Sequence, residues 1–197
     1  MENWLLKAKH WVIFTLTFGL LFLAQLIFLP FLILAEDPMP AFSIMGPACM
    51  MIYLIFFYWM YATGINLYKK LPPAVEMNLK RFKAFIIIPM LYLVCLSVLM
   101  FFLFNGGFSI QPDTHLGGVA TAFFLIVPVH FFSIFCIFYC FYFNAKALKA
   151  VELQQPVTFN DFGLDFILFW FYPIGVWFIQ PRINKIFSDD PGVVRGY

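Results

Sequence analysis

The chain has 197 residues, of which 63% are hydrophobic and only 11% are charged. Soluble domains are about half apolar and about a quarter charged, so a water-facing fold of this size cannot bury so much apolar surface. The composition excludes a soluble globular protein and indicates an integral membrane protein. The net charge of +2 adds little, because the placement of charge matters more than its sum in such chains.

The first predicted span covers residues 11–34 and follows Lys7 and Lys9. Its apolar run is longer than the hydrophobic region of a secretory signal peptide, which has about 7–15 residues. Residues 33–35, Ile-Leu-Ala, also lack the pattern of a cleavage site. We therefore expect this segment to stay attached as a membrane-spanning helix.

Three further stretches have the roughly 20 apolar residues that a helix needs to cross a bilayer core of about 30 Å: residues 47–68, 84–104 and 119–143. The chain is therefore expected to be a single all-α transmembrane domain, residues 1–197, with four transmembrane helices in two hairpins. The sequence Phe-Ser-Ile occurs at residues 42–44 and again at 108–110, in the loops after the first and third spans. This short match points to a parallel repeat of the two hairpins, as an alternative to two unrelated hairpins.

Basic residues are confined to alternate loops of the predicted bundle. Residues 35–46 and 105–118 contain no lysine or arginine. Because basic loops stay in the cytoplasm, we expect a multi-pass protein of the bacterial cytoplasmic (inner) membrane with both termini cytoplasmic. Five basic residues between the second and third spans favour anionic lipids at the inner surface by about 1 kcal/mol each: Lys69, Lys70, Lys80, Arg81 and Lys83.

Residues 164–181 form a fifth apolar stretch, which contains Pro173 and Gly175. Proline lacks the N–H that continues a helix, and glycine adopts conformations that reverse the chain. If the stretch turns back, all 12 lysines and arginines lie on one side of the membrane. We therefore expect a C-terminal re-entrant or interfacial helical hairpin that turns at Pro173 and Gly175, followed by a cytoplasmic tail of residues 182–197. A kinked full crossing is the alternative, because helices with an internal proline do span membranes.

A few polar residues in or beside the apolar segments are candidates for function. His130 lies near the centre of the fourth span, where we expect it to donate to a backbone carbonyl freed by a nearby proline kink. The alternatives are that it donates across to a neighbouring helix, lines a cavity or pathway, or relays protons. Gln25 in the first span is expected to hydrogen-bond between helices. Asp161 and Asp165 lie four residues apart, on one helix face at the mouth of the hairpin, and we expect them to pair with Arg182.

The chain lacks the sequence motifs of several catalytic classes, among them nucleotide-binding loops, zinc-protease helices and nucleophile elbows. Cys136 and Cys140 share a helix face, but no histidine or carboxylate accompanies them at metal-ligand spacing. The basic residues flank apolar helices and form no separate domain, which argues against nucleic acid as a partner. We therefore expect no catalytic residue, no cofactor and no metal site.

The C-terminal run from Ala145 to Phe187 resembles the ending of a group of uncharacterised small bacterial multi-pass inner-membrane proteins. Its most distinctive part is the string P-I-G-x-W-x-I-Q-P-R-I-N, from Pro173 to Asn184. The resemblance covers about the last quarter of the chain and implies location and topology, not chemistry.

The favoured function is a non-enzymatic scaffold or accessory subunit of a membrane complex, with the lipid bilayer and a protein partner or a second copy as partners. The first alternative is a small transporter or channel, with His130 and the turn at Pro173 and Gly175 near the pathway. A membrane enzyme acting on lipids is the second alternative, and it lacks a set of acid, base and nucleophile.

Overall fold

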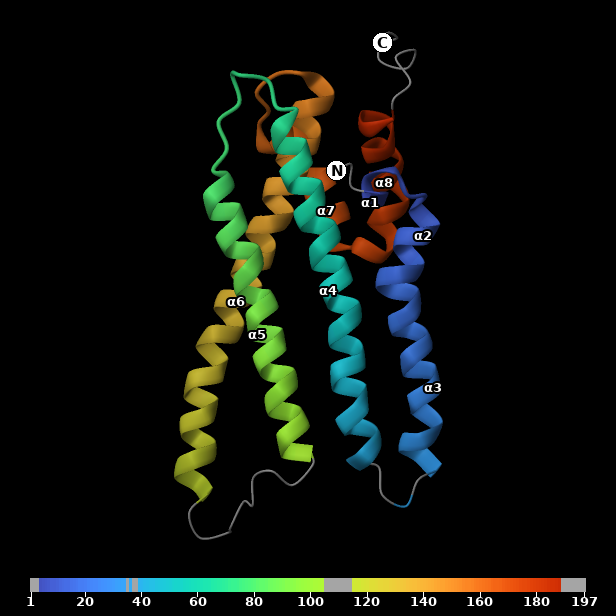
Figure 1. Ribbon diagram of the computed structural model, residues 1–197. Helices are drawn as coiled ribbons and strands as arrows, with labels where there is room; N and C mark the ends of the chain where they lie inside the picture. Colours follow the sequence, from blue (N-terminus) through green and yellow to red (C-terminus); the bar gives the residue numbers. More distant parts are fainter. Residues whose placement is uncertain (1–3, 35, 37–38, 105–114, 189–197) are drawn as a thin grey trace.

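In a computed structural model, residues 4–34, 36, 39–104 and 115–188 are described, and they form helices joined by short connections. Four long helical segments run side by side, and two shorter helices, α7 (Phe159–Trp170) and α8 (Tyr172–Phe187), pack beside the end of the bundle where the first described helix, Trp4–Lys7, lies (Figure 1). Four helices among the described residues are long and apolar enough to cross a membrane. This confirms the predicted all-helical class and the presence of four helices that could span a membrane.

The first long segment is built from several pieces. A short helix α1 (Trp4–Lys7) precedes α2 (His10–Phe14), a π-helical turn η1 (Thr15–Gly19) and α3 (Leu20–Leu34). The π turn is wider than an α-helical turn, and such turns are rare and often lie at functional sites. The first span is therefore a continuous but locally widened helix.

The other three long helices are α4 (Met39–Lys69), α5 (Leu79–Phe104) and α6 (His115–Leu153). Each of them contains an internal proline, which membrane helices tolerate when neighbouring groups satisfy the freed carbonyl. α6 continues beyond the apolar run that predicted it and stops where Gln154 adopts a positive φ of 52°. The helix therefore projects from the apolar part of the bundle to meet α7.

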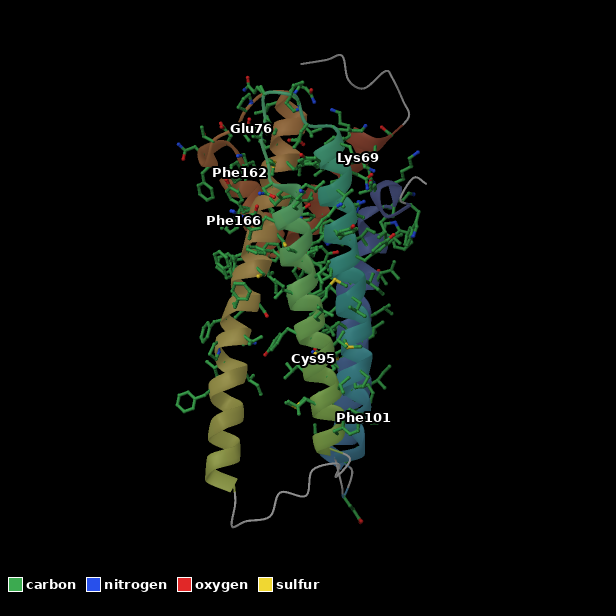
Figure 2. All side chains as sticks on the ribbon, turned by 60° about the vertical axis from the view of Figure 1, so that its left-hand side comes forward. Lys69, Glu76, Cys95, Phe101, Phe162 and Phe166 are labelled. Atoms are coloured by element: carbon green, nitrogen blue, oxygen red, sulfur yellow. The ribbon has the colours of Figure 1, made fainter. Side chains whose placement is uncertain are left out.

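The hydrophobic core occupies the end of the bundle that α7 and α8 cover. Its fully buried side chains come from most of the helices, and the largest include Trp59, Phe82, Phe143, Phe162, Phe169 and Ile179. Figure 2 shows Phe162 and Phe166 near the end marked by Lys69 and Glu76, whereas Phe101 lies toward the opposite end. Toward that opposite end, α3 and α5 expose large apolar side chains such as Ile33 and Phe101.

Two sequence boundaries differ from the structure. The helices of the C-terminal pair span 159–170 and 172–187, so α8 continues to Phe187 and the first residues of the expected tail, 182–187, are helical. Most of the expected tail, residues 189–197, lies outside the described residues, as does the second Phe-Ser-Ile sequence at 108–110. The helix extends because Arg182 and Asn184 have partners within the fold, as described below.

Candidate functional site

Polar side chains of α8, most of them in the C-terminal string, join this helix to several other parts of the chain. Together with Gly175, which packs closely on α7, we call them the α8 docking site: Tyr172, Gly175, Gln180, Arg182 and Asn184. Four of them form side-chain hydrogen bonds to residues more than one hundred positions away or in a different helix. The site is therefore a product of tertiary structure.

Gln180 is fully buried and bonds at both ends of its amide. Its carbonyl oxygen accepts a hydrogen bond from the indole N–H of Trp59 at 2.9 Å. Its amide nitrogen lies 2.8 Å from the Leu5 carbonyl oxygen, 3.1 Å from that of Ala8 and 2.9 Å from Asn184 Oδ1. The Asn184 amide also donates to the Ala8 carbonyl, at 3.0 Å. Gln180 and Asn184 thus tie the N-terminal segment and α4 to α8.

Arg182 holds two carboxylates at once. Its guanidinium forms two hydrogen bonds to Asp165 of α7 and two to Glu152 of α6, the latter at 2.7 and 2.6 Å. Burial lowers the pKa of Arg182, but the hydrogen bonds and charges of the two acids outweigh it and raise the pKa above its ordinary value. The bidentate geometry suits the planar guanidinium fork. The ion triad therefore fixes α8 against both α6 and α7.

The hairpin turn is sharper than predicted and lies earlier in the chain. Phe171 alone separates the two helices, and its φ of −85° and ψ of 53° break the helical path. Pro173 sits in the first turn of α8, where its missing N–H costs nothing. Gly175 lies inside α8, and a Cβ there would fall 1.7 Å from the Leu168 carbonyl oxygen. Gly175 therefore permits close packing of α8 on α7 and does not form the turn, which corrects the predicted role.

Tyr172 connects the start of α8 to the π turn of the first span. Its hydroxyl lies 2.7 Å from the Thr17 hydroxyl, and Thr17 in turn donates to the Ile13 carbonyl at 2.7 Å. The Tyr172 ring packs edge-on against Phe56 and Trp59, with centroids 4.7 and 5.1 Å away. The widened turn thus coincides with the place where the hairpin contacts the first span.

Asp161 does not pair with Arg182, contrary to the prediction. Its carboxylate accepts hydrogen bonds from the backbone N–H of Thr158 at 2.7 Å and from the Thr158 hydroxyl at 2.8 Å. These bonds, the backbone bond foremost, lower the pKa of Asp161 from its ordinary value. Asp161 is an N-terminal capping residue of α7, and of the two acids only Asp165 reaches Arg182.

His130 lies on α6 with an exposed side chain, and its hydrogen bond runs to a neighbouring helix. Its Nδ1 is 3.0 Å from the hydroxyl of Tyr92 on α5. The expected partner, a carbonyl freed by the Pro128 kink, is not the one found, because the Tyr92 side chain extends across from α5. The hairpin approaches α6 at Phe138, whose ring is 5.2 Å from that of Trp170. Eight residues, or about 12 Å of helix, separate Phe138 from His130.

Gln25 lies on α3 and is exposed. It makes no hydrogen bond to another residue that the structure describes, so it does not join helices within this part of the chain. The prediction that it hydrogen-bonds inside the bundle is therefore not met. A different side of α3 faces the neighbouring helices. It carries half-buried residues that recur at helical spacing: Leu21, Ala24 and Phe28.

Two buried polar atoms of the core have no hydrogen-bond partner among the described residues: the hydroxyl oxygen of Thr63 and the amide oxygen of Asn144. The Asn144 amide nitrogen donates to the Cys140 carbonyl at 3.0 Å. Within the described ranges, no group of three histidine, cysteine, aspartate or glutamate side chains could hold a metal ion. The α8 docking site can hold segments of the chain together, and its charged group, Arg182, is already paired with Asp165 and Glu152.

Several residues of the α8 docking site, and several of its bonding partners, were not predicted from the sequence. Glu152 could have been found as one of the few acids close in sequence to the hairpin. The four-residue spacing of Gln180 and Asn184 on one face of α8 was a second available signal. Thr17 and Trp59 gave no local signal, because each belongs to an apolar span and acquires its role only from a distant partner.

Comparison of the chain with known protein families, with curated proteins and with solved structures finds no match. The resemblance of the string from Pro173 to Asn184 to small bacterial membrane proteins therefore stays a prediction. A function has to be argued from the geometry of the chain itself.

Proposed function

We propose that the chain is a non-enzymatic integral membrane protein that serves as a scaffold or accessory subunit of a membrane complex. The supporting observation is the use of the polar groups of α8. Gln180, Arg182 and Asn184 all bond to other segments of the same chain, so their chemistry maintains a shape. A helix pair held in this way at one end of a bundle is suited to presenting a fixed surface to another protein.

We further propose that the end of the bundle with α7 and α8 faces the bacterial cytoplasm. Several basic residues belong to helices or connections at that end: Lys7, Lys69, Lys70, Arg182 and Lys185 (Figure 1). The loops of the opposite end have no basic residue in the sequence. The positive-inside rule therefore supports cytoplasmic termini, and anionic lipids are the expected neighbours of the basic end.

The C-terminal hairpin is proposed to dip into the inner leaflet and return. α7 and α8 have 12 and 16 residues, or about 18 and 24 Å of helix, so neither alone crosses a core of about 30 Å. The turn carries exposed apolar side chains at its apex, with Trp170, Phe171 and Ile174 between 48 and 63% exposed. Such side chains are suited to lipid, and the tryptophan to the headgroup boundary.

The two hairpins of long helices are proposed to form a parallel repeat. α4 contacts α3, and α5 contacts α6, so each half is an antiparallel pair with the same order. Equal orientation of the halves is what a repeat about an axis along the membrane normal requires.

The transporter alternative is less well supported by the geometry. The transporter hypothesis places both His130 and the hairpin turn near one pathway. The turn contacts α6 at Phe138, about 12 Å of helix away from His130, and His130 is hydrogen-bonded to Tyr92. The turn segment is also packed, because Gly175 lies directly on the backbone of Leu168. A lipid-acting enzyme has still less support, since the acids of the hairpin are engaged by Arg182 and Thr158.

Sidedness and hairpin depth are tested by two measurements. Reporter fusions at Met1 and Tyr197 should both give cytoplasmic signals, and a periplasmic signal at Tyr197 would restore a fifth crossing. Spin labels on Phe171→Cys and Phe159→Cys compare two positions of similar exposure, 54 and 56%, at opposite ends of α7. Re-entry places the label at 171 deep in the hydrocarbon and the label at 159 near water. Equal depths would mean that α7 lies flat in the interface.

The scaffold role is tested by purification from native membranes and by reconstitution. We expect the chain to migrate on native gels in a complex of fixed stoichiometry and to give liposomes no flux of ions or small solutes above protein-free controls. In the variant Arg182→Met, α8 detaches, so the chain should no longer migrate with the complex, while its four spans stay inserted in the membrane. Flux that His130→Leu abolishes would overturn the proposal in favour of the transporter alternative.

A further inference from the structure

The outer side of α3 carries a polar group where lipid would otherwise lie. Gln25 is exposed and has no hydrogen-bond partner among the described residues. Nine residues, or about 13 Å of helix, separate it from Leu34 at the end of α3. Since the hydrocarbon core is about 30 Å thick, this places the amide near the middle of the bilayer. The side chain is too short to reach water from there.

An amide in hydrocarbon without a hydrogen-bond partner is unfavourable, and polar residues within spans almost always face protein. Lipid chains offer neither donor nor acceptor. A surface with a mid-depth amide is therefore better matched by another helix than by lipid. His130 on α6 is also exposed, but it hydrogen-bonds to Tyr92 within the chain, whereas Gln25 has no partner among the described residues.

The exposed residues around Gln25 follow the spacing of a helix-packing surface. Phe22, Leu26, Leu29 and Ile33 are 49–70% exposed and recur with Gln25 at intervals of three and four residues. Residues at these intervals lie on one face of a helix, which is how two helices interlock. We call these five residues the α3 stripe. α3 lies at the flank of the bundle, so the stripe is open to an approaching helix (Figure 1).

We propose that the α3 stripe is the contact between two copies of this chain, in which the two Gln25 amides hydrogen-bond to each other. A carboxamide has both donors and an acceptor, so it can satisfy an identical group across a two-fold axis. Two copies inserted in the same direction bring the amides to the same depth without further adjustment. The amide carries no charge, so no partner with an opposite charge is required.

This contact deepens the proposed function by naming one partner, and it rests on the proposed membrane insertion but not on the scaffold role. Hydrogen bonds between membrane helices are modest in strength, so the apolar members of the stripe contribute most of the packing. Gln25 supplies the register, because only one alignment of the two helices pairs the amides.

The first test measures association of the purified full chain in lipid vesicles by energy transfer between labelled copies over a range of protein-to-lipid ratios. The parent chain should dimerise, and Gln25→Met, which keeps length and removes the hydrogen-bonding groups, should weaken association about 3- to 30-fold. Gln25→Asn keeps an amide and should retain more of the affinity. A monomeric parent, or equal association of the parent and Gln25→Met, would overturn the proposal.

The second test locates the contact by crosslinking in a background in which the four native cysteines are replaced. Leu26→Cys lies in the stripe, and Ile27→Cys is the control, since Ile27 is 62% exposed at the same depth on a different side of α3. We expect crosslinked dimers at 26 and few at 27. Crosslinking at 26 to a different protein, with the pure chain monomeric, would refute the second copy. Because complex formation in native membranes and liposome flux are measured separately, failure here leaves the scaffold proposal to its own test.

Discussion

Removing the arginine of the ion triad should undock the C-terminal hairpin. In Arg182→Met, the hydrogen bonds to Asp165 and Glu152 are lost and two carboxylates remain close together. The Asp165 side chain is only 5% exposed, so its charge would lie in a poorly solvated place without a counter-charge. Leaving a buried charge unpaired costs about 3–5 kcal/mol. Because the Arg182 and Glu152 side chains are 28 and 24% exposed, water reduces this to about 2–4 kcal/mol.

The assay is denaturant unfolding in lipid–detergent bicelles, combined with the labelling rate of Cys140 in a chain without the other three cysteines. Cys140 is 1% exposed in the hydrophobic core to which α7 and α8 also contribute, so its labelling reports opening at this end. Arg182→Met should lower the free energy of unfolding by the amount above and accelerate labelling. Arg182→Lys keeps the charge but not the bidentate fork, and should have an intermediate effect.

The double variant Asp165→Asn, Arg182→Met separates an unpaired charge from lost packing. If the unpaired carboxylate is the main penalty, the double variant should be more stable than Arg182→Met alone. The reasoning is refuted if Arg182→Met costs less than about 1 kcal/mol, or if the losses of the two single changes simply add.

Three other perturbations have equally definite outcomes. Gly175→Ala should lower the free energy of unfolding by at least about 3 kcal/mol, because its Cβ would fall 1.7 Å from a backbone carbonyl oxygen that cannot move away. In the control Gly163→Ala, the new Cβ meets only a ring atom at 3.4 Å, so the change should be less than about 1 kcal/mol. Equal effects of the two substitutions would disprove the close-approach argument. His130→Leu and Tyr92→Phe should each cost no more than about 1.5 kcal/mol in thermal unfolding, since they share one exposed hydrogen bond, and unequal losses would show that one of them has another role. The pKa of Asp161 is lowered in the fold, so its contribution to stability is present above the ordinary value of 3.8 and is lost as the pH falls through the lower folded pKa. The protection factors of the amide hydrogens in the first turn of α7 should therefore stay constant down to the ordinary value of 3.8 and fall below it in the parent, and Asp161→Asn should remove that pH dependence.

Membrane insertion and the four spans could be predicted from the residues alone because the bilayer acts as an external ruler. A core of about 30 Å demands long apolar runs, and such runs are visible in the sequence without knowledge of any contact. That the fifth apolar segment is interrupted was also readable, from Pro173, and it does consist of two helices. The turn itself was misplaced, because Phe171 looks like any other apolar residue until its backbone angles are known.

Partner choice within the α8 docking site could not be predicted in the same way. Asp161 and Asp165 lie on one helix face, so their spacing in the sequence predicted both of them as partners of Arg182. Local geometry engages Asp161 with Thr158 at the start of α7, while the rotation of α7 against α8 presents Asp165 to the guanidinium. Which of two similar acids pairs with Arg182 depends on that rotation, and helix rotation is a property of the packed interface.

The sequence by itself determined the class of protein, the four spans and the uneven distribution of charge, because each depends on composition or on residues adjacent in the chain. Only the tertiary structure decided that Gly175 is a packing contact, that Gln180 holds the N-terminal segment, and that Gln25 is exposed on α3. These roles are set by which helices touch and at what rotation. Such contacts join residues up to 176 positions apart, and no local pattern of apolar and polar residues encodes them.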